Sequence, residues 1–189
     1  MSTFSTDTLR STIIKQNGLA SNNRYRIVLP RLSGNIKADG NVINKEPADR
    51  EDLGTLCTSA RLPGKVLSVV DRNIGLEQIK IANGFTFSDA NLSFYLTNEY
   101  SARKYFQEWM DCVVSPKPPF TAGFHSNYAK RITIEQMDRD SKVIYTVELI
   151  KAYPTSISEI DLNNQAQTAA LELTVSLTYS NYIIKDNTN

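Results

Sequence analysis

The stretch FTFSDANLSFYLTNEYSARKYFQEWMDCVV, residues 85–114, changes its hydrophobic period in the middle. Leu92, Phe94 and Leu96 alternate with polar side chains, which is the period of two expected for a strand with one buried face. From residue 102 onward the apolar positions recur at helical spacing and include Phe106 and Trp109. The stretch therefore predicts a strand that runs directly into a helix. Its core anchors are predicted to be Leu92, Phe94, Phe106 and Trp109.

Local signals set the limits of the predicted helix. Asn98 is a suitable N-cap, and Pro116 prevents continuation, so the helix is expected at about residues 98–114. Trp109 is the only tryptophan of the chain. Because it lies on the apolar stripe of this helix, we interpret it as the largest anchor of the core.

Shorter alternating stretches predict the remaining strands, at residues 24–29, 56–60, 66–70, 76–81, 128–137, 142–150 and 171–179. Turn residues at 71–75 and 138–141 join two pairs of them, and Asn83–Gly84 predicts a further turn. These short connections favour antiparallel pairing. The sequence therefore predicts a mainly β protein, an antiparallel β-barrel or sandwich of about eight strands capped by one helix.

The chain divides into three expected parts. Residues 1–23 are polar and predict a flexible N-terminal arm, residues 24–184 a single domain, and residues 185–189 a C-terminal tail. Within the domain, residues 31–53 have no sustained period and predict a long loop. Such loops are usually mobile or serve as contact devices.

Composition excludes several classes of function. The 189 residues carry 21 basic and 20 acidic side chains, so the net charge of +1 gives no general attraction to nucleic acid or anionic lipid. Nothing at the N-terminus resembles an export signal, and no apolar run approaches the length that crosses a bilayer. We therefore expect synthesis in a cytosol and reduced thiols at Cys57 and Cys112.

No catalytic constellation is visible in the sequence. The single histidine, His125, lies in a polar loop without a nucleophile motif, and the two cysteines lack neighbouring metal ligands. The carboxylates are scattered over turn and cap positions, and the eight glycines are too dispersed for a phosphate loop. We expect no enzymatic activity, no metal and no cofactor.

Read in order, these elements resemble the tail tube proteins of contractile-tailed phages. The resemblance is carried by RYRIVL at 24–29, CTSARLPG at 57–64, the strand and helix at 85–111, the hairpin and aromatic-Pro-Thr crossing at 128–162, and the strand from Thr174 to Tyr179. It covers residues 24–180. The N-terminal arm and the 31–53 loop are longer than is usual in that family, and Tyr153 stands where tryptophan is common.

The resemblance implies a structural role. It implies hexameric rings that stack into a tube inside a contractile sheath, a tube that penetrates the host envelope and conducts the genome. The implied partners are further copies of the chain, the tail sheath protein, baseplate proteins, the tape measure protein, the tail terminator, and DNA that passes without specific binding. The implied location is the virion tail, assembled in the host cytoplasm.

Candidate contact residues follow from this implied role. Those for ring stacking and subunit contacts are Gly34, Asn41, Asp49, Arg50, Glu51, Asp71, Arg72 and Asn73. Those on the outward helix face, for a neighbour or the sheath, are Arg103, Lys104, Gln107, Glu108 and Asp111. Those for a wet lumen are Thr133, Glu135, Glu172, Thr174, Ser176 and Thr178. Deleting residues 34–52 is expected to leave the fold intact and to impair stacking.

Three alternatives to this first hypothesis stay open. Two belong to the same class: a baseplate protein that initiates the tube, and the tube of a bacterial contractile injection system. A third reading, from a different class, is a carbohydrate-binding β-sandwich module or a small hydrolase.

Overall fold

The computed structural model describes residues 6–15, 18–75, 77–163 and 170–186. Within these residues the chain forms nine strands and four helices. The helices are α1 (Thr6–Lys15), α2 (Arg50–Thr55), α3 (Ser101–Val113) and α4 (His125–Tyr128). The strands are β1 (Tyr25–Val28), β2 (Cys57–Ala60), β3 (Lys65–Ile74), β4 (Glu77–Phe87), β5 (Ala90–Tyr95), β6 (Lys130–Met137), β7 (Val143–Ile157), β8 (Glu172–Thr178) and β9 (Asn181–Asp186).

One long strand, β7, holds the body together by belonging to two layers. Residues 145–150 pair with β9, while residues 153–157 pair with β8. Lys151 lies between these two stretches with a positive φ of 55°, where the change of partner takes place. The sheet order β1-β6-β7-β8-β5-β2 therefore bends at β7 into two layers, with β9 beside the first half of β7.

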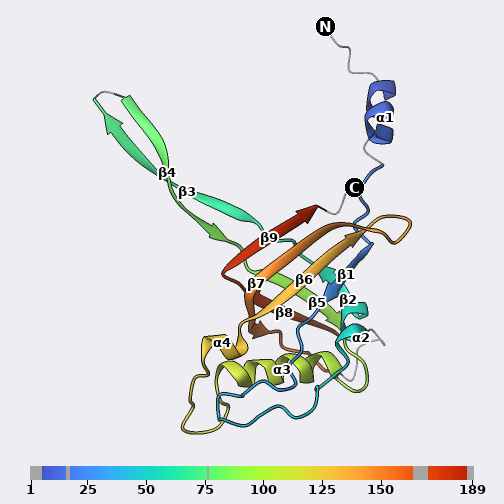
Figure 1. Ribbon diagram of the computed structural model, residues 1–189, viewed down its shortest axis with the longest axis vertical. Coiled ribbons are helices and arrows are strands. Elements are labelled where there is room, and N and C mark those ends of the chain that lie inside the picture. The colour runs from blue at the N-terminus through green and yellow to red at the C-terminus, as the bar shows by residue number, and fades with distance from the viewer. Residues whose placement is uncertain (1–5, 16–17, 76, 164–169, 187–189) are drawn as a thin grey trace.

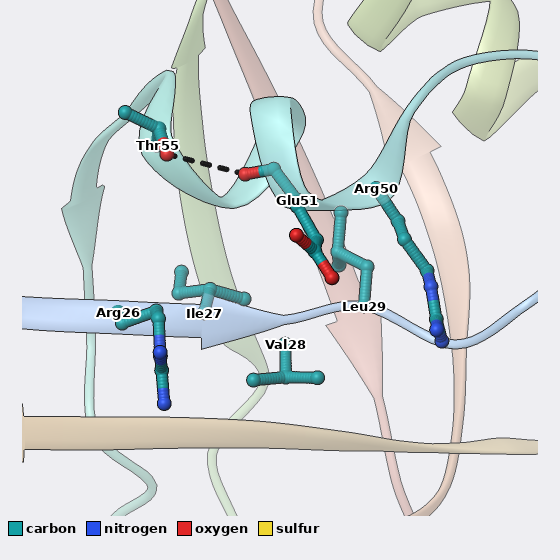
Figure 2. Close-up of a pocket in the computed structure, with 7 residues that line it drawn as sticks. All are labelled: Arg26, Ile27, Val28, Leu29, Arg50, Glu51 and Thr55. Carbon is teal, nitrogen blue, oxygen red and sulfur yellow. Dashed lines mark hydrogen bonds between the residues drawn. The ribbon is translucent and has the colours of Figure 1, made fainter.

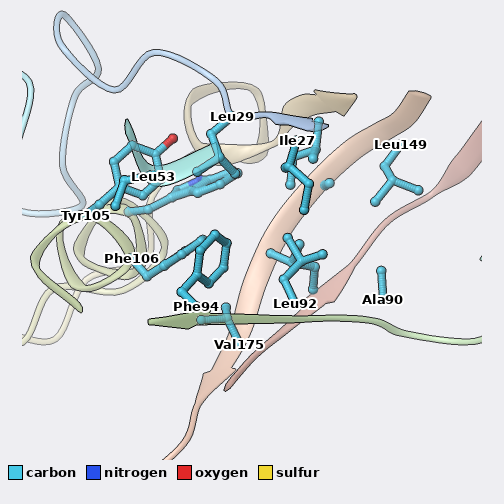
Figure 3. Packing of buried hydrophobic residues seen from close by; sticks show 14 of the residues in the cluster. Ile27, Leu29, Leu53, Ala90, Leu92, Phe94, Tyr105, Phe106, Leu149 and Val175 are labelled. Carbon is cyan, nitrogen blue, oxygen red and sulfur yellow. The ribbon is translucent and has the colours of Figure 1, made fainter. Parts of the chain in front are cut away.

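The core lies between the two layers and is closed by α3. Figure 3 shows Ile27 and Leu149 from one layer facing Leu92 and Ala90 from the other. The four core anchors predicted from the sequence, Leu92, Phe94, Phe106 and Trp109, each have an exposed fraction of 0%. The indole of Trp109 also donates a hydrogen bond of 2.8 Å to the carbonyl oxygen of Tyr128, just before β6.

The predicted antiparallel β fold is confirmed, and a strand passes into a helix within residues 85–114. The helix starts later than expected. Its N-cap is Tyr100, with a φ of 55°, and Asn98 lies outside it. A turn closed by the hydrogen bond from Tyr100 N–H to Thr97 C=O occupies the residues in between.

The turn predictions on either side of residue 76 are wrong. Asp71, Arg72 and Asn73 belong to β3, where they pair with Lys80, Ile79 and Gln78. Likewise, Asn83–Gly84 forms no turn and lies inside β4, at a register shift opposite Ser68 and Val69. The described turn residue is Gly75, with a φ of 66°. As a result β3 and β4 reach 10 and 11 residues, about twice the predicted length.

The expectation of a single helix is also wrong. Helix α1 lies within the predicted arm 1–23, α2 begins within the predicted loop 31–53 and ends at Thr55, and α4 begins at His125. Strand β9 was not predicted, and β7 continues to residue 157, into the expected crossing. These elements are short or depend on a distant partner, so local periodicity carries little signal for them. No described helix is long and apolar enough to cross a membrane.

Gly54 in α2 offers a test of how tightly this helix is seated on β1. A Cβ added at Gly54 would lie 2.3 Å from the carbonyl oxygen of Ile27. We expect Gly54→Ala to cost about 1–3 kcal/mol in the free energy of unfolding, because the backbone of β1 has to move. The measurement is urea denaturation followed by circular dichroism. The matched control is Gly84→Ala, where an added Cβ meets nothing within 4 Å; equal losses in the two variants would contradict this account.

Candidate assembly surfaces

The hairpin of β3 and β4 projects from the body of the molecule (Figure 1). Over the described residues these two strands pair only with each other and form a separate two-stranded sheet. An isolated two-stranded ribbon is marginally stable in water, and its outer edges present unpaired backbone groups. The hairpin is therefore the part of the fold that most needs a partner.

Large apolar side chains on this hairpin stay exposed over the part of the chain that the structure describes. Seven of them are at least 40% exposed, from Ile79 at 40% to Val66 at 59%. They are Val66, Leu67, Val69, Val70, Ile79, Ile81 and Phe85. Exposed apolar residues gathered in this number mark an interaction surface rather than ordinary surface scatter.

An aromatic cluster fixes the hairpin at its base. The ring of Phe87 lies 5.7 Å from that of Tyr179 and 5.2 Å from that of Tyr182, measured between centroids. The hydroxyl of Tyr179 donates a hydrogen bond to the carbonyl oxygen of Ser88 at 2.7 Å. Burial raises the pKa of Tyr179. The base of the ribbon is thus tied to the segment that joins β8 and β9.

A row of ion pairs crosses the outer face of the layer β1-β6-β7-β9. Arg26 pairs with Glu135 at 2.6 Å, while Arg131 and Lys185 pair with Glu148 at 3.3 and 2.6 Å. The hydrogen bond from Lys185 is the main cause that lowers the pKa of Glu148. Glu148 therefore links three strands, because Arg131 and Lys185 come from the two strands on either side of it.

Glu148 gives this layer a predictable response to acid. Its folded-state pKa lies below the ordinary value of 4.5, so its stabilising effect is present above that pH and is lost as pH falls through the folded pKa. We expect Glu148→Gln to lower stability at neutral pH and to approach the wild type as pH falls below 4.5. Thermal melts from pH 7 to pH 3 measure this. The exposed Glu172→Gln is the control, and a constant Glu148→Gln deficit across that range would contradict the prediction.

The other layer has a different outer face, rich in hydroxyl groups. Ser93 and Thr174 lie 3.2 Å apart through their side-chain oxygens, and Ser176 donates to the amide oxygen of Asn91 at 2.8 Å. Four of the predicted lumen residues, Glu172, Thr174, Ser176 and Thr178, alternate along β8 with buried residues and share this face. The other two, Thr133 and Glu135, lie on the outer face of the ion-paired layer. Since the core separates the two outer faces, the predicted lumen residues do not form one surface.

The candidate contact residues of α3 divide into two groups. Glu108 and Asp111 both pair with Lys37, and the carbonyl oxygen of Asp111 accepts a hydrogen bond from Ala38 N–H at 3.1 Å. These two acids thus hold the 31–53 segment against the helix. Arg103, Lys104 and Gln107 are exposed and remain candidates for contacts with a neighbour or the sheath.

The 31–53 segment is part of the fold rather than an idle loop. Leu32, Ile43 and Leu53 are buried in the core, and the carboxylate of Glu46 accepts hydrogen bonds from the backbone N–H groups of Leu32 and Ser33. Deleting residues 34–52 removes Ile43, Glu46 and half of α2, so in place of an intact fold we now expect this deletion to destabilise the body. The predicted stacking residues of this segment, Gly34, Asn41, Asp49 and Glu51, are exposed, and Arg50 is half-buried.

A pocket of about 420 Å³ lies between β1 and α2. Figure 2 shows Arg26 and Val28 pointing to one side of β1 and Ile27 and Leu29 to the other. The carbonyl oxygen of Ile27 faces Gly54 of α2, so the helix covers this edge of the sheet. The lining of this pocket is mixed, with the charged residues Arg26, Arg50 and Glu51 beside apolar residues of β1.

The remaining candidates for chemistry lie apart from one another. The thiols of Cys57 and Cys112 are free, and burial raises the pKa of each to about 11. His125 is exposed at the start of α4, with its ring 5.3 Å from that of Tyr128. In the part of the chain that the structure describes, no group of three or more His, Cys, Asp or Glu side chains is placed to hold a metal.

Comparisons with solved structures show the same fold in tube-associated proteins of contractile machines. The tube-terminating cap of an anti-feeding prophage is 13% identical, with a TM-score of 0.62 over 89% of this chain and 91% of that one. The sheath/tube terminator of an extracellular contractile injection system is 12% identical, with a TM-score of 0.59 over 88% and 96%. The sheath–tube complex of such a system contains a chain that is 12% identical, with a TM-score of 0.58 over 97% and 99%.

Comparison at the level of sequence families identifies the chain. No curated protein matches it significantly, and nothing in the comparisons supports the carbohydrate-binding alternative. The family model described as phage tail tube protein matches residues 20–185, which include the hairpin and all of the β body except the last residue of β9. The chain therefore belongs to the phage tail tube protein family.

Proposed function

We propose that this protein forms hexameric rings with further copies of itself, and that the rings stack into the inner tube of a contractile tail. The observation that carries the proposal is the projecting β3–β4 hairpin with its seven exposed apolar side chains. A surface of this kind is unfavourable in a free subunit and favourable in an assembly that buries it. A hairpin that docks on a different surface of the next copy makes a heterologous contact, and contacts of that kind generate rings or open polymers.

The hydroxyl-rich face of β5 and β8 is our candidate for the lumen. Its groups are neutral apart from Glu172, so it offers DNA few charges to bind. The opposite face exposes the cations of Arg26 and Arg131, with side-chain exposed fractions of 58% and 62%. Although they pair with Glu135 and Glu148, these cations are far more exposed than the carboxylates, so this face would attract phosphate groups and we place it away from the DNA path.

The proposed partners follow from this arrangement. The tail sheath protein would surround the tube, with Arg103, Lys104 and Gln107 of α3 as contact candidates. Baseplate proteins, the tape measure protein and the tail terminator would meet the ends or the interior. The assembled protein would reside in the virion tail after assembly in the host cytoplasm.

Electron microscopy of the purified protein tests the proposal. Concentrated protein, alone or with baseplate added, is expected to show six-fold rings and stacked tubes. Monomers alone under both conditions would contradict it.

The similarity to tube terminators favours a second candidate, a subunit that ends or starts the tube. Such a protein would form single rings that cap existing tubes, whereas the main subunit forms tubes of many rings. The tube of a bacterial contractile injection system is a further possibility within the same class. Neighbouring genes separate it from a phage tail, since only the phage has capsid genes.

A further inference from the structure

The strand register sorts the side chains of the hairpin onto its two faces. Residues directly opposite each other on paired strands point to the same side, and successive residues alternate. Leu67 pairs with Phe85 and Val69 with Ala82, so these residues share one face. The other face carries Val66 and Val70. It also carries Ile81, which pairs with Val70, and Ile79, which pairs with Arg72.

The apolar residues change face along the hairpin. On one face they lie near the body, and we call this group the first patch: Leu67, Val69 and Phe85. Further from the body, the same face carries the opposite charges of Asp71 and Lys80. On the other face they extend further from the body and form the second patch: Val66, Val70, Ile79 and Ile81.

One covering surface cannot bury both patches. A neighbour lying against the first patch leaves the second exposed to water. Each Å² of apolar area left exposed forgoes a favourable burial free energy of about 25 cal/mol. The exposed fractions of the two patches are similar, from 55% to 58% in the first and from 40% to 59% in the second. The hairpin thus presents two apolar faces of comparable character, and each needs a cover.

We propose that the hairpin is inserted between two further copies of this chain, one covering the first patch and the other the second. This inference rests on the proposed function and deepens it. Stacking alone requires the hairpin to contact one further subunit, whereas the inference assigns it two. A ribbon held from both sides also resists bending and pulling, as the shaft of a tube must.

Copies of this chain suit both patches for two reasons. Exposed apolar side chains also occur away from the hairpin, at Val114, Phe120 and Phe124, in the segment between α3 and α4. Figure 1 places α3 and α4 at the end of the body opposite the hairpin tip, so a copy displaced along that direction brings such residues toward the hairpin. In addition, a net charge of +1 produces little repulsion between copies.

Paired substitutions on each face test the inference. Leu67→Ser with Phe85→Ser removes the first patch, and Val70→Ser with Ile81→Ser removes the second. The matched control is Asn73→Ser with Gln78→Ser, a polar cross-strand pair of the same ribbon. We expect each patch variant to raise the protein concentration needed for tube formation about tenfold or more, the effect of losing one binding hot spot. The control is expected to assemble as the wild type does.

Photo-cross-linking identifies the two partners. A benzophenone amino acid replaces Leu67 or Ile81 in otherwise wild-type protein, which is then assembled. The two positions are expected to capture different peptides of neighbouring subunits. Capture of the same peptide from both positions, or loss of assembly from one patch variant only, overturns the inference while leaving the tube proposal intact. A wild type that stays monomeric overturns both. Circular dichroism and melting of each variant show whether the body remains folded.

Discussion

Replacing Trp109 with alanine is expected to lower the free energy of unfolding by about 3–5 kcal/mol, one of the largest losses available to a single substitution in this chain. Trp109 is fully buried, and its ring stacks on Phe106 at an interplanar angle of 12° and meets Tyr105 edge to face. Truncation removes these contacts and leaves a cavity under α3. Urea denaturation followed by far-ultraviolet circular dichroism measures the loss, because the variant has no tryptophan fluorescence.

The variant Trp109→Phe separates packing from hydrogen bonding. It keeps an aromatic ring on Phe106 but cannot donate to the carbonyl oxygen of Tyr128. We expect it to lose about 1–3 kcal/mol, less than Trp109→Ala, because a buried acceptor is left without this donor. Equal losses in the two variants would mean that the hydrogen bond, and not the packing of the indole, holds α3 on the body.

The success of sequence reasoning around Trp109 has a physical cause. In residues 85–114 one face of a strand and one stripe of a helix enter the same core, so the period of the apolar residues records the structure directly. The same holds for β6, the start of β7 and β8, whose inward residues Ile134, Val147 and Val175 are all buried. Where burial is one-sided and local, periodicity suffices.

Periodicity did not predict the full length of the β3–β4 hairpin, where the described side chains are exposed except that of Phe87. Asp71, Arg72 and Asn73 have the composition of a turn, yet they lie within β3 and are exposed. Apolar residues on both faces obscure alternation, and a register shift at Asn83 interrupts it. A strand whose partners are other molecules follows a pattern that a single subunit does not explain.

The candidate contact residues show a similar limit. The sequence predicted Glu108 and Asp111 as outward contact residues, whereas in the structure both are half-buried and pair with Lys37. Their partner Lys37 comes from a segment more than seventy residues away along the chain, which no local pattern can indicate. Conversely, the sequence shows the apolar residues of the hairpin but not that they are exposed. Their exposure follows from the structure, in which the ribbon projects from the body.

Shortening the hairpin is the second change with a large expected effect. Replacing residues 68–84 with the turn Asn-Gly joins Leu67 to Phe85, which already face each other in the ladder, through a two-residue loop. The aromatic cluster at the base, Phe87 with Tyr179 and Tyr182, is retained. Because the removed part pairs with no other described strand, the melting temperature is expected to remain close to that of the wild type.

Tube formation by the shortened protein is expected to be lost at every concentration at which the wild type assembles. The deletion removes four of the seven exposed apolar side chains, and with them the whole second patch except Val66. Negative-stain images and sedimentation velocity measure tubes and rings separately. If rings persist while tubes vanish, the hairpin joins one ring to the next; if both vanish, it also joins subunits within a ring. Tubes of normal length from the shortened protein would show that the hairpin, despite its exposed apolar faces, plays no part in assembly.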